Sequence, residues 1–422
     1  MTGRAGAAEP PAVIRAALAA LPTGPLGVAV SGGSDSVALA CLLADWAAAG
    51  GRRLEAVTVD HRLRPESGAE AAAVARLCAG RGVPHAILAW QEGPGGGNLQ
   101  AGARAARHRL IAGWAAERGI AMVALGHTLD DQAETFLLRL ARGSGIDGLA
   151  AMAPAVRIGG LLWLRPLLGL RRATLRNWLT AREITWSEDP SNTDPRFDRV
   201  RARAALEPLS RLGLGPERLA ATAAAMARGR LALDAAAGEL ARAAIAPGVA
   251  GDALVDPAPL RAAPEELRLR VLAGTLAWVG GTIWRPRLAS LAALDAAIAA
   301  NRIRGGITLH GCVIRTRKGR LAIRREPSGV APPRPAGTGV WDGRWELADT
   351  ASVADGVLIG ATGEAGLAQC PGWRDTGHPR ETLLTTPALW QGARLVSAPL
   401  AREGTPGPFR RISALAPPWS PR

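Results

Sequence analysis

The most informative stretch of the chain is Leu26-Gly-Val-Ala-Val-Ser-Gly-Gly-Ser-Asp-Ser36. Its first five residues form a short apolar run that predicts a buried strand, and a helix-like stretch follows from Val37 to about Ala49. In the loop between them, glycines allow close approach of the backbone, and the start of a helix points free N–H groups at an anion. The loop therefore predicts a phosphate site, with ordinary helix capping as the alternative. Its residues are Ser31, Gly32, Gly33, Ser34, Asp35 and Ser36.

The next hundred or so residues repeat this alternation of strand and helix. Strands are expected at 54–59, 85–90 and 122–125, and helices at 66–81, 98–118 and 128–141. This pattern predicts an α/β fold in which a parallel sheet carries helices on both faces. Ligands of such sheets bind at the carboxyl ends of the strands, where Asp60, Gly126 and His127 lie. We expect these three residues to contact a nucleotide; strand capping by Asp60 and a structural role for His127 are the alternatives.

An acidic first turn opens the helix that is expected at 128–141. Asp130 and Glu134 are four residues apart and Asp131 and Glu134 three, so all three carboxylates can reach one side of the helix start. They are candidate catalytic residues, although stabilisation of the helix dipole is the usual role of such residues. Arg104, on the preceding helix, is a candidate for balancing phosphate charge, with a solvated helix face as the alternative.

The remainder of the chain changes character after about residue 210. Residues 210–300 are rich in Ala, Leu and Arg with helical periodicity, and 302–325 resembles a hairpin with eight basic residues and no acid. We expect a catalytic domain at 1–210, a helical domain with the basic hairpin at 211–326 and a linker at 327–339. A small β-rich or mixed domain with a flexible tail is expected at 340–422.

The amino-acid composition excludes several classes of function. The 422 residues carry a formal net charge of +15, which favours a polyanionic partner. A GC-rich genome explains arginine in place of lysine, but it does not explain the excess of bases. Lys318 is the only lysine, and its surroundings exclude a phosphate loop of the GxxxxGK type. The four cysteines form no CxxC pair, which argues against zinc and iron–sulfur sites and favours free thiols. With no signal peptide or membrane span expected, we predict a cytoplasmic protein without membrane contact.

At the Ser31–Ser36 loop the sequence resembles the PP-loop, or N-type, ATP pyrophosphatases, and further motifs resemble one branch of them, the tRNA(Ile)-lysidine synthases. These motifs occur in order along residues 26–205. They are Val59-Asp-His-Arg-Leu-Arg64, Asn98-Leu-Gln-Ala-Gly-Ala-Arg104, Gly126-His-Thr-Leu-Asp-Asp-Gln-Ala-Glu-Thr135, Arg142-Gly-Ser-Gly-Ile-Asp-Gly-Leu149, Arg165-Pro-Leu-Leu168 and Trp186-Ser-Glu-Asp-Pro-Ser-Asn-Thr-Asp194.

The resemblance implies ATP as a substrate and Mg²⁺ held by Asp35 and Asp131. It implies that free L-lysine is attached to the wobble cytidine of an isoleucine tRNA with a CAU anticodon, after ATP has adenylated that cytidine. Arg199, Arg201 and Arg203 are then expected to contact the anticodon region. Trp186 is a candidate for stacking on the cytidine, with a buried core tryptophan as the alternative. Val200 departs from the family, which usually has asparagine there.

Several points stay open at the level of sequence. The sequence does not divide the roles among the carboxylates. It does not determine the oligomeric state either, and a homodimer is one option. A second PP-loop enzyme class, the tRNA thiolases, is an alternative function, but only Cys41 and Cys78 lie in the expected catalytic domain. A nucleotide-binding module without catalysis is a further alternative, although it has no need of the acidic helix start or of a basic C-terminal half.

Overall fold

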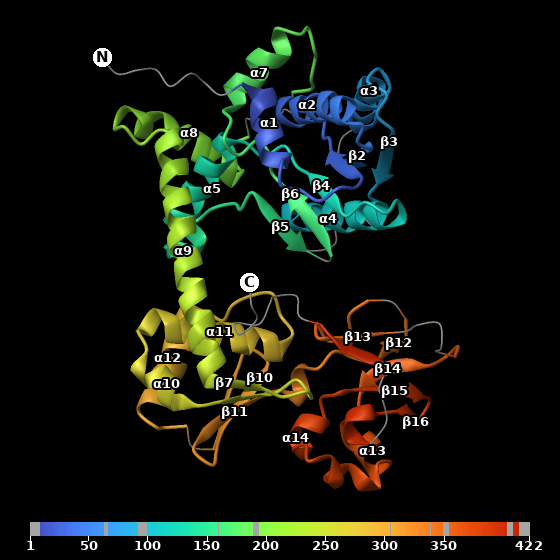
Figure 1. Cartoon of the computed structure of the whole chain (residues 1–422), viewed down its shortest axis with the longest axis vertical. Coiled ribbons are helices and arrows are strands. Elements are labelled where there is room, and N and C mark those ends of the chain that lie inside the picture. The colour runs from blue at the N-terminus through green and yellow to red at the C-terminus, as the bar shows by residue number, and fades with distance from the viewer. Residues whose placement is uncertain are drawn as a thin grey trace. The chain divides into compact units, whose positions relative to one another are not determined.

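The computed structural model of the chain comprises two compact units, residues 1–230 and 231–422 (Figure 1). It describes residues 9–62, 66–91, 99–158, 160–188, 194–303, 305–337, 339–348, 354–402 and 408–412. The predicted domain boundaries at 210, 326 and 339 stay predictions. The expected flexible tail lies largely outside the described residues.

A six-stranded sheet forms the centre of the N-terminal unit, in the order β3-β2-β1-β4-β6-β5. The strands are β1 (Leu26–Ala29), β2 (Leu54–Asp60), β3 (His85–Ala89), β4 (Met122–Ala124), β5 (Ala155–Ile158) and β6 (Leu161–Leu164). All neighbours pair in parallel except β5, which pairs with β6 as an antiparallel hairpin. The predicted parallel α/β sheet is therefore confirmed, with an antiparallel edge strand that the sequence pattern did not indicate.

Helices cover both faces of this sheet, as predicted. Their bounds are α1 (Pro10–Leu18), α2 (Ser34–Gly50), α3 (Ser67–Ala79), α4 (Leu99–Glu117), α5 (Leu129–Ala141), α6 (Ile146–Leu149), α7 (Arg172–Thr180) and α8 (Asp198–Arg211). Successive residues of a strand point to opposite faces. Met122 and Ala124 accordingly join the core beneath α1, α2 and α7, whereas Val123 joins the core beneath α4. Gly27 on β1 leaves room for the Val123 side chain on this face of the sheet, because a Cβ at Gly27 would lie only 2.9 Å from that side chain.

The C-terminal unit contains a helical region that packs on an antiparallel sheet. Helix α9 (Pro216–Ala244) runs into this unit, which continues with α10 (Pro257–Ala262), α11 (Glu265–Gly280) and α12 (Leu288–Ala299). The sheet has the order β7-β8-β11-β10-β9. Its strands are β7 (Ile245–Pro247), β8 (Ala253–Val255), β9 (Ile307–Leu309), β10 (Cys312–Arg317) and β11 (Arg320–Arg325).

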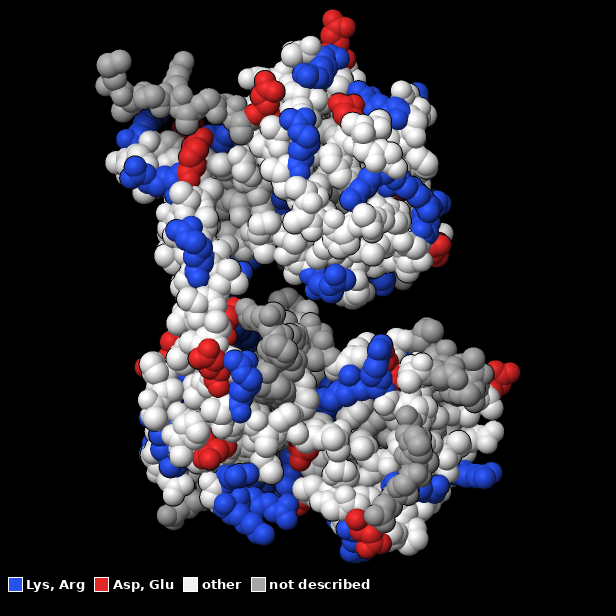
Figure 2. Space-filling model, in the orientation of Figure 1, with Lys and Arg blue, Asp and Glu red and all other residues white. Residues whose placement is uncertain are grey.

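The predicted basic hairpin is present as β10 and β11, which pair from Cys312–Arg325 to Arg317–Arg320. Arg315, Arg317, Lys318 and Arg320 at its tip are exposed. Figure 2 shows more basic than acidic side chains on the face in view, in both units. The excess of positive charge is thus available at the surface.

The last part of the chain forms two further small sheets. One has the order β12-β14-β15-β16, and the other pairs β13 with β17. The strands are β12 (Arg334–Pro335), β13 (Trp345–Leu347), β14 (Leu358–Ala361), β15 (Pro387–Gln391), β16 (Arg394–Ser397) and β17 (Phe409–Arg411). The short helices α13 (Gly363–Ala368) and α14 (Arg380–Leu383) accompany them. The stretch 327–339, expected to be a linker, contributes β12, because Arg334 and Pro335 pair with Ile359 and Leu358.

Two expectations from composition can be compared with the structure. All four cysteines are buried and free, as predicted. Within the described ranges, none of the helices combines the length and the apolar character that crossing a membrane requires.

Candidate active site

The loop between β1 and α2 is held in a fixed shape by its own side chains. Ser36 Oγ donates to the carbonyl of Gly33 at 2.9 Å and accepts from the Ser31 amide at 3.1 Å. Gly32 has φ +90°, a conformation that side-chain-bearing residues rarely adopt. The carbonyl of Val30 accepts a hydrogen bond from Thr58 Oγ1 at 2.8 Å, which fixes the end of β1. The backbone of the predicted phosphate loop is therefore preorganised without a ligand.

The start of α2 leaves room for an anion. Gly33 is the N-cap residue, and no side chain caps the helix there. A Cβ at Gly33 would meet no atom within 4 Å, so the space before the helix N-terminus is open. Gly126 is different, since a Cβ there would lie 3.0 Å from Ser36 N and Cα. Sequence reasoning assigned Gly126 to nucleotide contact; the structure shows that it lets the end of β4 pack against the first turn of α2.

The first turn of α5 carries the acidic residues. Thr128 and Asp131 form a capping box, in which Asp131 Oδ2 accepts from the Thr128 amide at 2.8 Å and from Thr128 Oγ1 at 2.9 Å. Asp131 and Glu134 are buried, and their side chains are 8% and 1% exposed. Burying charged carboxylates is costly unless they are paired, so cations must lie close to them.

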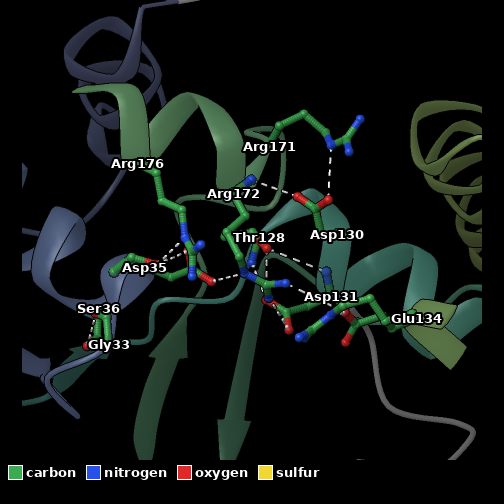
Figure 3. A network of polar contacts seen from close by, with 12 residues as sticks. Gly33, Asp35, Ser36, Thr128, Asp130, Asp131, Glu134, Arg171, Arg172 and Arg176 are labelled. Atoms are coloured by element: carbon green, nitrogen blue, oxygen red, sulfur yellow. Dashed lines mark hydrogen bonds and ion pairs between the residues drawn. The ribbon is translucent and has the colours of Figure 1, made fainter. Parts of the chain in front are cut away.

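Arg172 is the cation at the centre of this site (Figure 3). Its guanidinium donates to Asp35 Oδ2 at 2.8 Å and to Asp131 Oδ1 at 3.3 Å, and lies 3.6 Å from Glu134 Oε1. One side chain at the start of α7 therefore joins the phosphate loop on α2 to the acidic turn of α5. The predicted catalytic residues Asp35, Asp131 and Glu134 are brought together through it.

The three carboxylates respond differently to this environment. Burial raises the pKa of Asp35, despite the opposing effect of Arg172. Burial, and then the charge of Asp131, raises the pKa of Glu134. Burial also acts on Asp131, but Arg172 and the Thr128 amide outweigh it and hold the pKa of Asp131 below its ordinary value. Asp131 is thus the most strongly ionised member, whereas Asp35 and Glu134 each take a proton more readily than an ordinary carboxylate.

Asp130 faces α7 rather than the other two carboxylates of its turn. It accepts from the backbone amide of Arg172 at 2.7 Å and from Arg171 Nε at 3.0 Å. Both of its oxygens are therefore used to hold the start of α7. The sequence interpretation of Asp130 as catalytic stays a prediction, and this geometry supports a positioning role instead.

The predicted tRNA-binding arginines on α8 divide between two sides. Arg203 Nε donates to Glu134 Oε1 at 2.9 Å, and Arg199 lies 3.5 Å from Asp131 Oδ1. Arg201, between them in sequence, bonds to the carbonyls of Pro195 and Arg196. Residues four apart share a helix face and residues two apart do not, which accounts for the difference. Arg199 and Arg203 border the acidic site, and Arg201 does not.

The structure also shows the surroundings of four other predicted residues. Asp60 accepts from the Arg62 amide at 2.9 Å, and burial lowers the pKa of His127 to about 4. Arg104 makes no hydrogen bond or ion pair to any described residue. Trp186 is half-buried against the core beneath α2 and donates to Glu188 at 2.9 Å. It lies beside the phosphate loop, because the amide of its neighbour Ser187 bonds to the Gly32 carbonyl.

Among the described residues, no group of three His, Cys, Asp or Glu side chains could enclose a metal ion. Asp35 and Asp131 lie close enough for the charge of Asp131 to raise the pKa of Asp35. Magnesium commonly uses one or two carboxylates together with phosphate oxygens and water. These two residues therefore fit Mg²⁺ that arrives with a nucleotide, provided that Arg172 gives way.

The thiolase alternative finds little support. Cys41 and Cys78 are buried in α2 and α3, and burial raises the pKa of each thiol to about 11. Since the thiolate is the reactive form of cysteine, neither thiol is prepared to act as a nucleophile.

Sequence reasoning missed the central role of Arg172. This residue was not among the candidates selected from the sequence, although it is one of nine arginines between residues 171 and 211. A signal was present, because cations are unfavourable at a helix N-terminus unless a carboxylate compensates. Two consecutive arginines at the start of α7 therefore required acidic partners.

The comparisons with known proteins agree with this geometry. A family model described as a PP-loop domain matches residues 12–210. A tRNA(Ile)-lysidine synthase from Ruegeria pomeroyi is 46% identical over 392 residues, covering 92% of this chain and 91% of its own. The enzyme of that name from Mesorhizobium japonicum is 38% identical over 384 residues, covering 88% of this chain and 83% of its own.

Among solved structures, a U34-tRNA thiolase from Methanococcus maripaludis has a TM-score of 0.45 and 17% identity, covering 52% of this chain and 76% of its own. That likeness is too low to bear on function. The relatives from Ruegeria and Mesorhizobium match nearly the whole chain at substantial identity. The chain belongs to the tRNA(Ile)-lysidine synthase family of PP-loop proteins.

Proposed function

We propose that the chain joins free L-lysine, through its ε-amine, to C2 of the wobble cytidine of isoleucine tRNA with a CAU anticodon, and that it converts ATP to AMP and diphosphate. Family membership supports the overall reaction. The observation that carries it in this chain is Arg172, which joins the open phosphate loop to Asp131 and Glu134. We infer that a site for ATP phosphates adjoins a site for an ammonium group.

In the first step, the C2 oxygen of the cytidine attacks the α-phosphorus of ATP, and diphosphate leaves. The open N-terminus of α2 binds the phosphates through its amide groups, and Ser34 adds a hydroxyl. Asp35 and Asp131 would hold Mg²⁺, which when bound neutralises phosphate charge. Arg172, now paired with Asp35, is placed to exchange that carboxylate for a phosphate oxygen.

In the second step, the lysine ε-amine attacks C2, and AMP leaves with the former C2 oxygen. The ammonium has an ordinary pKa of about 10.4, so it must lose a proton first. Glu134 is suited to accept it, since its Oε2 is buried without a hydrogen-bond partner in the described structure and burial raises its pKa. Asp131, which stays ionised, is suited to orient the ammonium.

The C-terminal unit is proposed to bind the body of the tRNA. Its exposed Arg315, Arg317, Lys318 and Arg320 gather at the tip of the β10–β11 hairpin, where phosphates can neutralise them. We place the reaction in the cytoplasm, where ATP and tRNA occur together. A homodimer remains compatible with the proposal, and light scattering during size-exclusion chromatography measures it.

The direct test incubates the protein with the isoleucine tRNA transcript, ATP and labelled lysine. Label should enter the RNA, and it should disappear when the wobble cytidine is replaced by uridine. Asp35→Ala and Glu134→Ala should each abolish the transfer of label. Absence of label with the wild-type protein, or its persistence after the cytidine is replaced, contradicts the proposed reaction.

A further inference from the structure

Four guanidinium groups, which we name the arginine cluster, lie close enough together for their charges to act on one another, and three of them also act on His127. They are Arg104 and Arg107, one turn apart on α4; Arg165, directly after β6; and Arg199, in the first turn of α8. Burial is the largest cause that lowers the pKa of Arg104 and of Arg107. Repulsion from Arg199 lowers the pKa of Arg104 further, and repulsion from Arg104 and Arg199 lowers the pKa of Arg107 further. Repulsion from Arg104 acts likewise on the pKa of Arg165. Like charges have thus been gathered in one place.

The described residues supply very little negative charge to this cluster. Arg107 bonds only to an imidazole, with its Nη2 3.2 Å from His61 Nε2. Arg165 is 8% exposed and donates to the carbonyl of Ala153 at 2.8 Å. Among the described residues, the carboxylate that contacts a member of the cluster is Asp131, 3.5 Å from Arg199 and already paired with Arg172. Like charges gathered in this way repel one another, and an anion bound among them would relieve that repulsion.

Unpartnered donors point to the same conclusion. In the described structure, Arg165 Nε, His127 Nδ1 and His61 Nδ1 are buried without a hydrogen-bond partner. Buried polar atoms are nearly always satisfied, so a missing acceptor is expected at this place. Both the charge and the hydrogen-bonding capacity therefore call for a group rich in anionic oxygens.

We propose that the arginine cluster is a second anion site, distinct from the phosphate loop, and that it binds a phosphodiester flanking the wobble cytidine. The inference rests on the proposed function. An RNA strand must enter and leave its site, and the cluster is open to solvent, with Arg104 and Arg107 exposed and the Arg199 side chain 45% exposed. The phosphates of ATP already have a site at α2.

The position of the cluster suits this ligand. His127 is close enough to Asp131 on one side, and to Arg104, Arg165 and Arg199 on the other, for all four charges to act on its pKa. A phosphodiester bound by the cluster would therefore place the attached cytidine next to the carboxylates of α5. This arrangement anchors the reacting nucleotide independently of contacts to its base.

The test uses RNA hairpins that carry the anticodon loop and have one methylphosphonate, which removes a single phosphate charge. Substitution at one of the two phosphodiesters flanking the wobble cytidine should lower kcat/KM of the wild-type protein about tenfold, the size of one charge-assisted hydrogen bond. The Arg107→Gln variant should show the same decrease in kcat/KM with the unmodified hairpin, about tenfold, and the methylphosphonate should lower it little further. Arg104→Gln should behave in the same way. Arg109→Gln, on the same helix, serves as the matched control and should keep the wild-type sensitivity.

The outcomes separate the sources of phosphate. An increased KM for ATP in Arg107→Gln, with full sensitivity to the methylphosphonate, would assign the cluster to the nucleotide and overturn the proposal. The proposal is also overturned if the methylphosphonate lowers kcat/KM equally in the wild type and in both variants at every position. If the wild-type protein does not modify even the unmodified tRNA, the proposed function fails. Equilibrium binding of the same hairpins then still shows whether the single charge and Arg107 interact.

Discussion

Replacing Arg172 by glutamine should destabilise the protein in a manner that depends on pH. The substitution removes the cation that contacts Asp35, Asp131 and Glu134, whose side chains are 16%, 8% and 1% exposed. Removing one partner from a buried ion pair costs about 3–5 kcal/mol. Because Arg199 and Arg203 still lie near Asp131 and Glu134, we expect about 3 kcal/mol near pH 8.

The dependence on pH follows from the two carboxyls whose pKa is raised. Burial places the folded-state pKa of Asp35 and of Glu134 above the ordinary values, and loss of Arg172 raises both further. A folded state that holds protons more tightly than the unfolded state loses stability as pH increases through the interval between the two pKa values. The variant should therefore lie closer to wild-type stability at pH 5 than at pH 8.

Urea denaturation at a series of pH values, followed by circular dichroism, measures this effect. Arg142→Gln is the matched control, since its ion pair with Asp198 is largely exposed and should contribute less than about 1 kcal/mol at any pH. A loss of stability in Arg172→Gln that is the same at pH 5 and pH 8 would refute the reasoning, because uncompensated carboxylates must respond to protonation.

Four further predictions concern the same site. Gly126→Ala places a Cβ 3.0 Å from the backbone of Ser36 and should weaken ATP binding about tenfold by displacing the first turn of α2, as titration calorimetry can measure. Gly33→Ala should leave urea stability unchanged, because no atom lies within 4 Å of the new Cβ, yet should also weaken ATP binding; undiminished affinity would mean that phosphates bind elsewhere. Glu134→Gln should lower lysine transfer at least about 100-fold while diphosphate release on tRNA without lysine continues, and loss of both would contradict its role in the second step. Asp130→Asn should cost about 1 kcal/mol by weakening the cap of α7 and leave the KM for lysine unchanged; an increased KM would return Asp130 to the substrate site.

The sequence was sufficient to predict the sheet, the glycine-rich loop between β1 and α2 and the acidic turn, because each depends on local pattern. The apolar run before Ser31 and the spacing of Asp131 and Glu134 are properties of adjacent residues. The function of Arg172 could not be predicted in this way, since its three carboxylate contacts join α2, α5 and α7. The packing role of Gly126 was missed for the same reason, because it depends on the first turn of α2, some ninety residues earlier in the chain.

Among the described residues, the cations that contact the three central carboxylates are all arginines: Arg172, Arg199 and Arg203. A guanidinium stays protonated at any physiological pH and is a poor nucleophile. A lysine at any of these places would present an amine of the same kind as the substrate to the activated cytidine. Whatever the origin of these arginines, in the proposed reaction they avoid a covalent link between the enzyme and its own RNA. In that reaction the adenylated cytidine can persist beside these cations until free lysine binds.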